Sequence, residues 1–143
     1  MKTMLIKAFA IFATITAFAF NVAPGGEGFE IYLNNTPVIQ QYGADVKIVR
    51  TLSLNAQTTG DQLTVKYHHC GKAGQNRIIR VRDEQHRSLL TLDYGNANRP
   101  GAGMLVNTKE IIKLKKPGRS LELFYSSNEL PGGRTLANVV IAD

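Results

Sequence analysis

The stretch that decides the fold is LTVKYHHC, residues 63–70, in which apolar and polar side chains alternate. The odd-numbered residues from Leu63 to His69 form a mainly apolar set, and the even-numbered residues from Thr64 to Cys70 form a mainly polar one. Successive side chains of a β-strand point to opposite faces. The alternation therefore predicts a strand with one buried face.

The same period of two recurs through most of the chain after residue 28. It predicts about eight short strands separated by turn signals, at residues 29–33, 38–39, 46–54, 63–70, 79–82, 90–94, 121–125 and 136–141. This pattern is typical of an all-β domain, and we expect a single antiparallel β-sandwich, with a small β-barrel as the alternative. Only one short helix is expected, beginning after Asn107 and ending before Pro117.

Local signals refine three of these predictions. Asn34-Asn35 reads as a turn, and Pro37 indicates that the strand after it lies at a sheet edge. Arg50 interrupts the apolar parity of residues 46–54, which predicts a bulge or a strand end there. The segment Pro131-Gly132-Gly133 predicts a turn between the last two strands.

The beginning of the chain has the pattern of a secretory signal peptide. Lys2 and Lys7 precede an apolar run, Ala8–Phe20, and Ala17-Phe18-Ala19 offers small residues for cleavage after Ala19. The run is shorter than the roughly 20 apolar residues that a membrane span needs. We therefore expect a cleaved signal at 1–19, a flexible leader at 20–28 and one domain at 29–143. The expected location is secreted or periplasmic, with no membrane span after cleavage.

Charge and cysteine content limit the expected partners. Cleavage would remove two of the 17 lysines and arginines and none of the 11 acids, so the formal charge would fall from +6 to +4. That charge is too small for a typical nucleic-acid-binding domain. An envelope protein or an extracellular polymer is the expected partner. The single cysteine cannot form a disulfide within the chain, so packing must supply the stability.

The pair His68 and Cys70 suggests a metal site. On one face of a strand their side chains would lie roughly 7 Å apart, and His86 could supply a third ligand for zinc or copper. The alternative is structural. In that interpretation His69 packs in the core with its nitrogens bonded to backbone, Cys70 is buried, and His68 lies at the surface.

A second candidate site is a basic stripe made of Lys66, Arg80, Arg82 and Arg87. If these residues lie on neighbouring segments, they could bind an acidic polymer, phosphate groups or an acidic protein face. The alternative is a solvated outer sheet face, in which nearby acids balance the charges. Those acids are Asp83, Glu84, Asp93 and Glu122.

No set of residues with catalytic spacing stands out, and the glycine-rich segments do not match a phosphate-binding loop. We therefore expect an exported, non-catalytic binding or interaction module of β-sandwich type. Its recognition surface is expected at the loops Gly71–Asn76 and Gly95–Gly103, because binding residues concentrate on loops held by a rigid scaffold. The alternative function is that of an exported metal-binding protein, and an enzyme ranks last.

Overall fold

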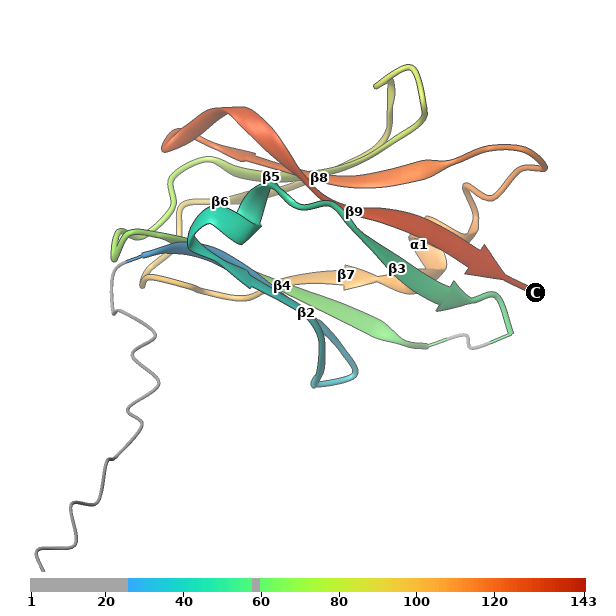
Figure 1. The fold of residues 1–143 in the computed structure, drawn as a ribbon, viewed down its shortest axis with the longest axis horizontal. Helices are drawn as coiled ribbons and strands as arrows, with labels where there is room; N and C mark the ends of the chain where they lie inside the picture. The colour runs from blue at the N-terminus through green and yellow to red at the C-terminus, as the bar shows by residue number, and fades with distance from the viewer. Residues whose placement is uncertain (1–25, 58–59) are drawn as a thin grey trace, which may run out of the picture.

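The computed structural model describes residues 26–57 and 60–143, which form two layers of β-strands (Figure 1). The predicted signal peptide at 1–19, most of the predicted leader, and Thr58-Thr59 of a predicted turn lie outside the described residues. Within the described ranges, no helix has the length and apolar character that crossing a membrane requires.

One layer is a four-stranded sheet with the order β2-β1-β4-β7, in which all neighbours are antiparallel. Its strands are β1 (Glu27–Leu33), β2 (Thr36–Tyr42), β4 (Gln62–His69) and β7 (Met104–Asn107). The sequence 63–69 lies within β4, and its odd-numbered side chains are buried as predicted. Asn34 and Asn35 both have positive φ angles, of 50° and 66°, and form the predicted tight turn between β1 and β2. The strand that carries Pro37, β2, lies at the sheet edge, as predicted.

The other layer is a five-stranded sheet with the order β3-β9-β8-β5-β6. Its strands are β3 (Arg50–Asn55), β5 (Arg77–Arg82), β6 (Ser88–Gly95), β8 (Leu121–Ser127) and β9 (Leu130–Ala142). All neighbours in this sheet are antiparallel except β3 and β9, which are parallel. The predicted all-β sandwich is therefore confirmed, with nine strands in the described residues where about eight were expected.

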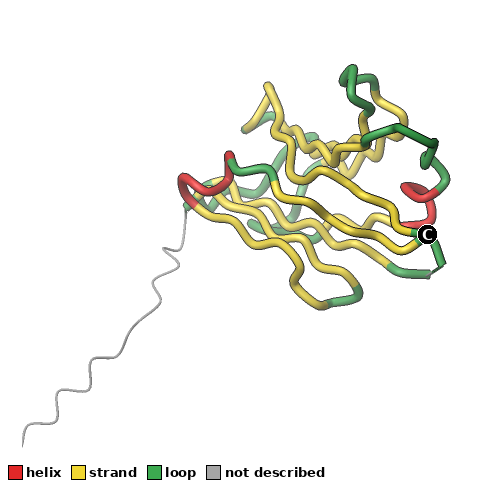
Figure 2. The backbone as a smooth tube through the Cα atoms, turned by 45° about the vertical axis from the view of Figure 1, so that its right-hand side comes forward, coloured by secondary structure: helices red, strands yellow, loops and turns green. Residues whose placement is uncertain are grey.

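The described residues include two short helical segments, which lie at the ends of strands (Figure 2). The 3-10 helix η1 (Gly43–Lys47) connects the two sheets, and the α-helix α1 (Thr108–Ile112) follows β7. As the sequence predicts, Asn107 caps α1, because its side-chain oxygen accepts a hydrogen bond from the Lys109 amide at 3.0 Å.

The core lies between the sheets and is built from the alternating apolar positions. Tyr67 of β4 stacks on Tyr125 of β8 with 4.6 Å between ring centroids, so this pair joins the two sheets directly. The other fully buried large side chains include Phe29, Ile31, Leu63, Ile79, Met104, Ile111, Leu123 and Leu136. This packed interior holds in place the strand ends from which the loops emerge.

Two predictions about strand ends differ from the structure. Residues 46–48 were expected in a strand, but Val46 lies in η1, where the buried Gln41 amide donates hydrogen bonds to the Asp45 and Ile48 carbonyls. β3 begins at Arg50, where the sequence predicted an interruption.

The turn predicted at residues 131–133 is also wrong. The chain turns at Asn128 and Glu129, and residues 131–133 lie inside β9. There the pairing register with β8 shifts, and Gly133 has a φ of 68°. The Pro-Gly-Gly signal therefore marks a bulge, a feature with similar glycine preferences. β7 was not predicted, because the exposed Leu105 between two buried apolar residues hides its alternation.

Candidate functional site

The three residues proposed as metal ligands lie in different surroundings. His68 is on the outer face of β4, with its Nε2 atom 3.3 Å from Glu30 Oε1. Cys70 follows the end of β4 with a φ of 53°, so it does not continue the strand face of His68. His86 lies between β5 and β6 in the other sheet, with Nδ1 2.9 Å from Glu122 Oε1. The part of the chain that the structure describes contains no group of three or more His, Cys, Asp or Glu side chains arranged to hold a metal ion.

The structural alternative for this segment is correct in part. His69 is buried, but its Nε2 atom contacts the Tyr125 hydroxyl at 2.8 Å and the Ser127 hydroxyl at 3.3 Å, where backbone partners were expected. Burial lowers the pKa of His69 below its ordinary value of 6.5. Cys70 is exposed, which corrects the expectation that it is buried. Its place in a turn with positive φ keeps it outside the core.

The basic stripe is divided between the two sheets. Lys66 lies on the four-stranded sheet, with its ammonium 4.9 Å from the Tyr32 ring centroid. Arg80 and Arg82 lie on β5 of the other sheet, and Arg87 follows in the turn. The four residues therefore do not form one continuous stripe.

The arginines of this group have partners within the molecule. Arg82 Nε donates to Glu122 Oε1 at 2.7 Å, and its guanidinium stacks 3.6 Å from the Phe124 centroid. Burial would raise the pKa of Glu122, but hydrogen bonds from His86 and Arg82 outweigh it and lower the value. Arg80 donates to Ser126, and Arg87 pairs with Asp83 at 2.8 Å. This arrangement fits the charge balance that the alternative interpretation expected, but its central pair, Arg82 and Glu122, is largely buried and not solvated.

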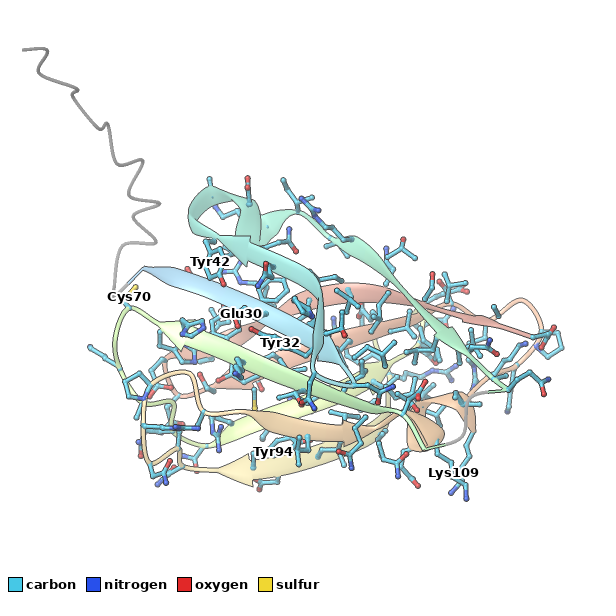
Figure 3. All side chains as sticks on the ribbon, turned by 90° about the horizontal axis from the view of Figure 1, so that it is seen from below. Glu30, Tyr32, Tyr42, Cys70, Tyr94 and Lys109 are labelled. Atoms are coloured by element: carbon cyan, nitrogen blue, oxygen red, sulfur yellow. The ribbon has the colours of Figure 1, made fainter. Side chains whose placement is uncertain are left out.

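A carboxylate cluster that the sequence analysis missed lies on the outer face of the four-stranded sheet (Figure 3). Glu30 accepts hydrogen bonds of 2.5 Å from the hydroxyls of both Tyr32 and Tyr42, and His68 approaches the same carboxylate. Burial would raise the pKa of Glu30, but these hydroxyls outweigh it and lower the value. The spacing of Glu30 and Tyr32, two residues apart in a strand, was the available signal. The cluster satisfies its own hydrogen bonds, which favours a structural role.

The two loops predicted as a recognition surface do lie together. The Ala97 amide donates to the Gly74 carbonyl at 2.8 Å, and the Asn76 amide donates to the Asn96 side chain at 2.9 Å. The turn between β8 and β9 joins them, because the Gln75 amide donates to the Glu129 carboxylate at 3.0 Å. Cys70 marks this end of the molecule in Figure 3, opposite Lys109 beside α1. We call these three segments, residues 70–76, 95–103 and 127–129, the loop end.

Arg77 anchors the loop at 95–103 to the start of β5. It is the first residue of β5 and is only 8% exposed. Its Nε and Nη2 atoms donate to the Gly95 and Tyr94 carbonyls at 3.2 and 3.3 Å, and Nη1 donates to the Ala102 carbonyl at 3.2 Å. One side chain thus holds both ends of the loop at 95–103.

A surface hollow of about 540 Å³ is lined by this arginine and by residues of the loop at 95–103. We call it the Arg77 hollow; its lining residues are Arg77, Asn96, Asn98, Arg99, Ala102 and Gly103. Asn98 and Arg99 are exposed, and neither makes a hydrogen bond or ion pair with a described residue.

Comparison of the chain with protein-family models and with curated protein sequences finds no match. The candidate site is therefore assigned from its own residues.

The lining of the Arg77 hollow consists of guanidinium groups, side-chain amides and small residues. Amide and guanidinium groups are strong hydrogen-bond donors, so the hollow is equipped to hold a polar group by several contacts at once. The lining includes no thiol, imidazole or carboxylate that could act as a nucleophile or a general base.

Proposed function

We propose that this chain is an exported, non-catalytic binding module of β-sandwich type whose ligand site is the Arg77 hollow. The observation that carries the proposal is one polar hollow, which the predicted recognition loop at 95–103 forms with Arg77. The other predicted loop, 71–76, is hydrogen-bonded to this loop beside the hollow. Asn98 and Arg99 face this hollow without partners among the described residues. Loops held rigidly by a sandwich are a common way to present such side chains to a ligand.

The partner in this proposal is a polymer or protein of the cell envelope or its surroundings. The N-terminal signal pattern supports export, and the modest positive charge does not favour nucleic acid. The hollow is open and polar, so it suits a group that projects from a larger molecule.

The test is retention of envelope material on the immobilised chain, purified after export. The wild-type chain should retain a specific component from the envelope fraction of its own cell. The double variant Asn98→Ala/Arg99→Gln should lose most of this retention, because it removes both free side chains and leaves the Arg77 contacts in place. The matched control is Asn138→Ala/Arg50→Gln, which changes the same residue types at exposed positions of the paired strands β9 and β3, separated from the Arg77 strand β5 by β8.

The control should retain the component as the wild-type chain does. Equal retention by the two double variants would show that the hollow is not the binding site. Absence of retained material on the wild-type chain, beyond that on an unrelated β domain, would contradict a binding role altogether.

A further inference from the structure

We propose that the Arg77 hollow binds an oxyanion, a carboxylate, sulfate or phosphate group carried by the ligand. This inference rests on the proposed function, since it names the ligand chemistry of the same site. The buried arginines differ in whether a carboxylate balances their charge. Arg82 and Arg134 are largely buried and pair with Glu122 and Glu27 at 2.5 and 2.8 Å, whereas Arg77 has no carboxylate partner among the described residues.

A buried guanidinium without a counter-charge is unusual, because removing a full charge from water is costly. The three carbonyls around Arg77 offer only partial charges, so the group keeps its net positive charge. A guanidinium has five N–H donors. The three carbonyl contacts use one donor on each nitrogen, which leaves a further N–H on each terminal nitrogen without an acceptor among the described residues.

The other residues that line the hollow supply further hydrogen-bond donors. Arg99 adds a second guanidinium, and Asn98 adds a side-chain amide. The oxygen of Asn96 is already occupied by the Asn76 amide, so its NH₂ group is the part left for a ligand. The lining carries two positive charges and no carboxylate. An oxyanion offers only acceptors and negative charge, and guanidinium groups bind such anions through paired hydrogen bonds.

The size of the hollow indicates that the anion is one group of a larger ligand. A volume of about 540 Å³ lies within the range of small-molecule sites. A lone sulfate or phosphate ion would fill only part of it. We expect the anionic group to contact Arg77 and Arg99, with the rest of the ligand lying over the loop at 95–103.

The experiment is a titration of the isotopically labelled chain, followed by backbone amide chemical shifts. The probes are sulfate, phosphate and glucuronate, with glucose as the neutral probe, and chloride keeps the ionic strength constant. Saturable shifts are expected at residues 74–77 and 95–103 with the anions and not with glucose. The relative affinities of the three anions then identify which oxyanion the site prefers.

Two variants distinguish specific anion binding in the hollow from nonspecific attraction to positive surface charge. Arg99→Gln should weaken anion binding about tenfold, since it removes charge-assisted hydrogen bonds while keeping the Arg77 contacts. Arg50→Gln removes one exposed positive charge on β3, at the edge strand on the β9 side of the five-stranded sheet that also contains Arg77, and should leave the affinity unchanged. Equal weakening by both variants, or shifts as large with glucose, would overturn the inference.

This titration can fail independently of the proposed function. If envelope material is retained through Asn98 and Arg99 but no anion binds, the ligand contacts are neutral and only the oxyanion inference is overturned. If anions bind but no envelope component is retained, the oxyanion site stands and the proposed role as a binding module for envelope material is wrong.

Discussion

The imidazole of His69 lies between the two sheets, where the hydroxyls of Tyr125 and Ser127 contact its Nε2 atom. The ring of Tyr67 also lies 4.7 Å from it, centroid to centroid. Protonation would place a positive charge in this buried setting, and the cost of burial outweighs the attraction of Glu129 and Glu27 and lowers the pKa of His69. The unfolded chain has no such restriction and takes up the proton more readily. His69 therefore links folding to pH.

We predict that the free energy of unfolding falls as the pH drops through about 6.5 toward the lower folded-state pKa of His69. The sign follows from proton binding: in this window the unfolded state binds more protons than the folded state, so acid favours unfolding. Urea denaturation at about pH 7.5 and about pH 5.5 measures the change. His69→Gln should reduce this pH dependence, and His68→Gln should keep it. A wild-type chain equally stable at both pH values would contradict the prediction.

At the scale of one element, β9 combines a long strand with a local irregularity. Gly133 has a φ of 68°, and an added Cβ would come within 2.0 Å of the Phe124 ring and 2.9 Å of the Tyr125 carbonyl. Both the backbone conformation and the close approach of β8 therefore require glycine. Its neighbour Gly132 has no atom within 4 Å of the corresponding position.

We predict that Gly133→Ala lowers the free energy of unfolding by about 2 kcal/mol or more, from backbone strain and the clash with β8. Gly132→Ala should change it by less than about 1 kcal/mol, since open space surrounds that position. Urea denaturation of both variants gives the comparison. Similar losses of stability in the two variants would show that the bulge does not depend on Gly133.

The elements also show which parts of the fold the sequence could predict. The alternation of residues 63–69 and the Asn34-Asn35 turn depend on local chemistry, and both predictions are confirmed. The Pro131-Gly132-Gly133 segment was misinterpreted, because bulges and turns use the same residue types and only pairing with β8 distinguishes them. The interruption at Arg50 was recognised, but the fold of η1 depends on the tertiary contacts of Gln41.

The candidate site was predictable to the same limited degree. Both loops were identified by composition, but their contact depends on hydrogen bonds between residues far apart in the chain. In the sequence alone, nothing distinguishes Arg77 from an exposed polar residue at the start of a strand. Its burial follows from three carbonyls that the folded loop brings around it. The separation of His68 from His86 depends in the same way on which strands join which sheet.

At the scale of the whole molecule, the two sheets are held together by their shared core. No internal disulfide is available, since the chain has a single cysteine. Glu27, Tyr67 and Arg134 add a polar connection, in which the carboxylate accepts hydrogen bonds from the phenol at 2.5 Å and from the guanidinium at 2.8 Å. Because Arg134 belongs to the five-stranded sheet and the other two to the four-stranded sheet, this contact also spans both layers.

We predict that Leu123→Ala lowers the free energy of unfolding by about 2–5 kcal/mol, because it opens a cavity in the middle of the shared core. Leu123 is fully buried, whereas Val140 is 51% exposed on the neighbouring strand β9. Val140→Ala should change stability by no more than about 0.5 kcal/mol. Thermal denaturation of the two variants tests this difference, and a small effect of Leu123→Ala would mean that the sheets do not depend on this contact.

The parallel pairing of β3 with β9 sets the order in which the molecule can assemble. Arg50 pairs with Ala137, and β9 separates β3 from β8 in the sheet. Before residues 130–142 have been synthesised, β3 has no neighbouring strand in the sheet. It therefore remains unpaired until almost the whole sequence has been made. Such distant pairings slow folding, to milliseconds or seconds in typical all-β domains of comparable topology. Throughout that time the edge of β3 exposes unpaired N–H and C=O groups, so aggregation competes with folding until β9 is in place.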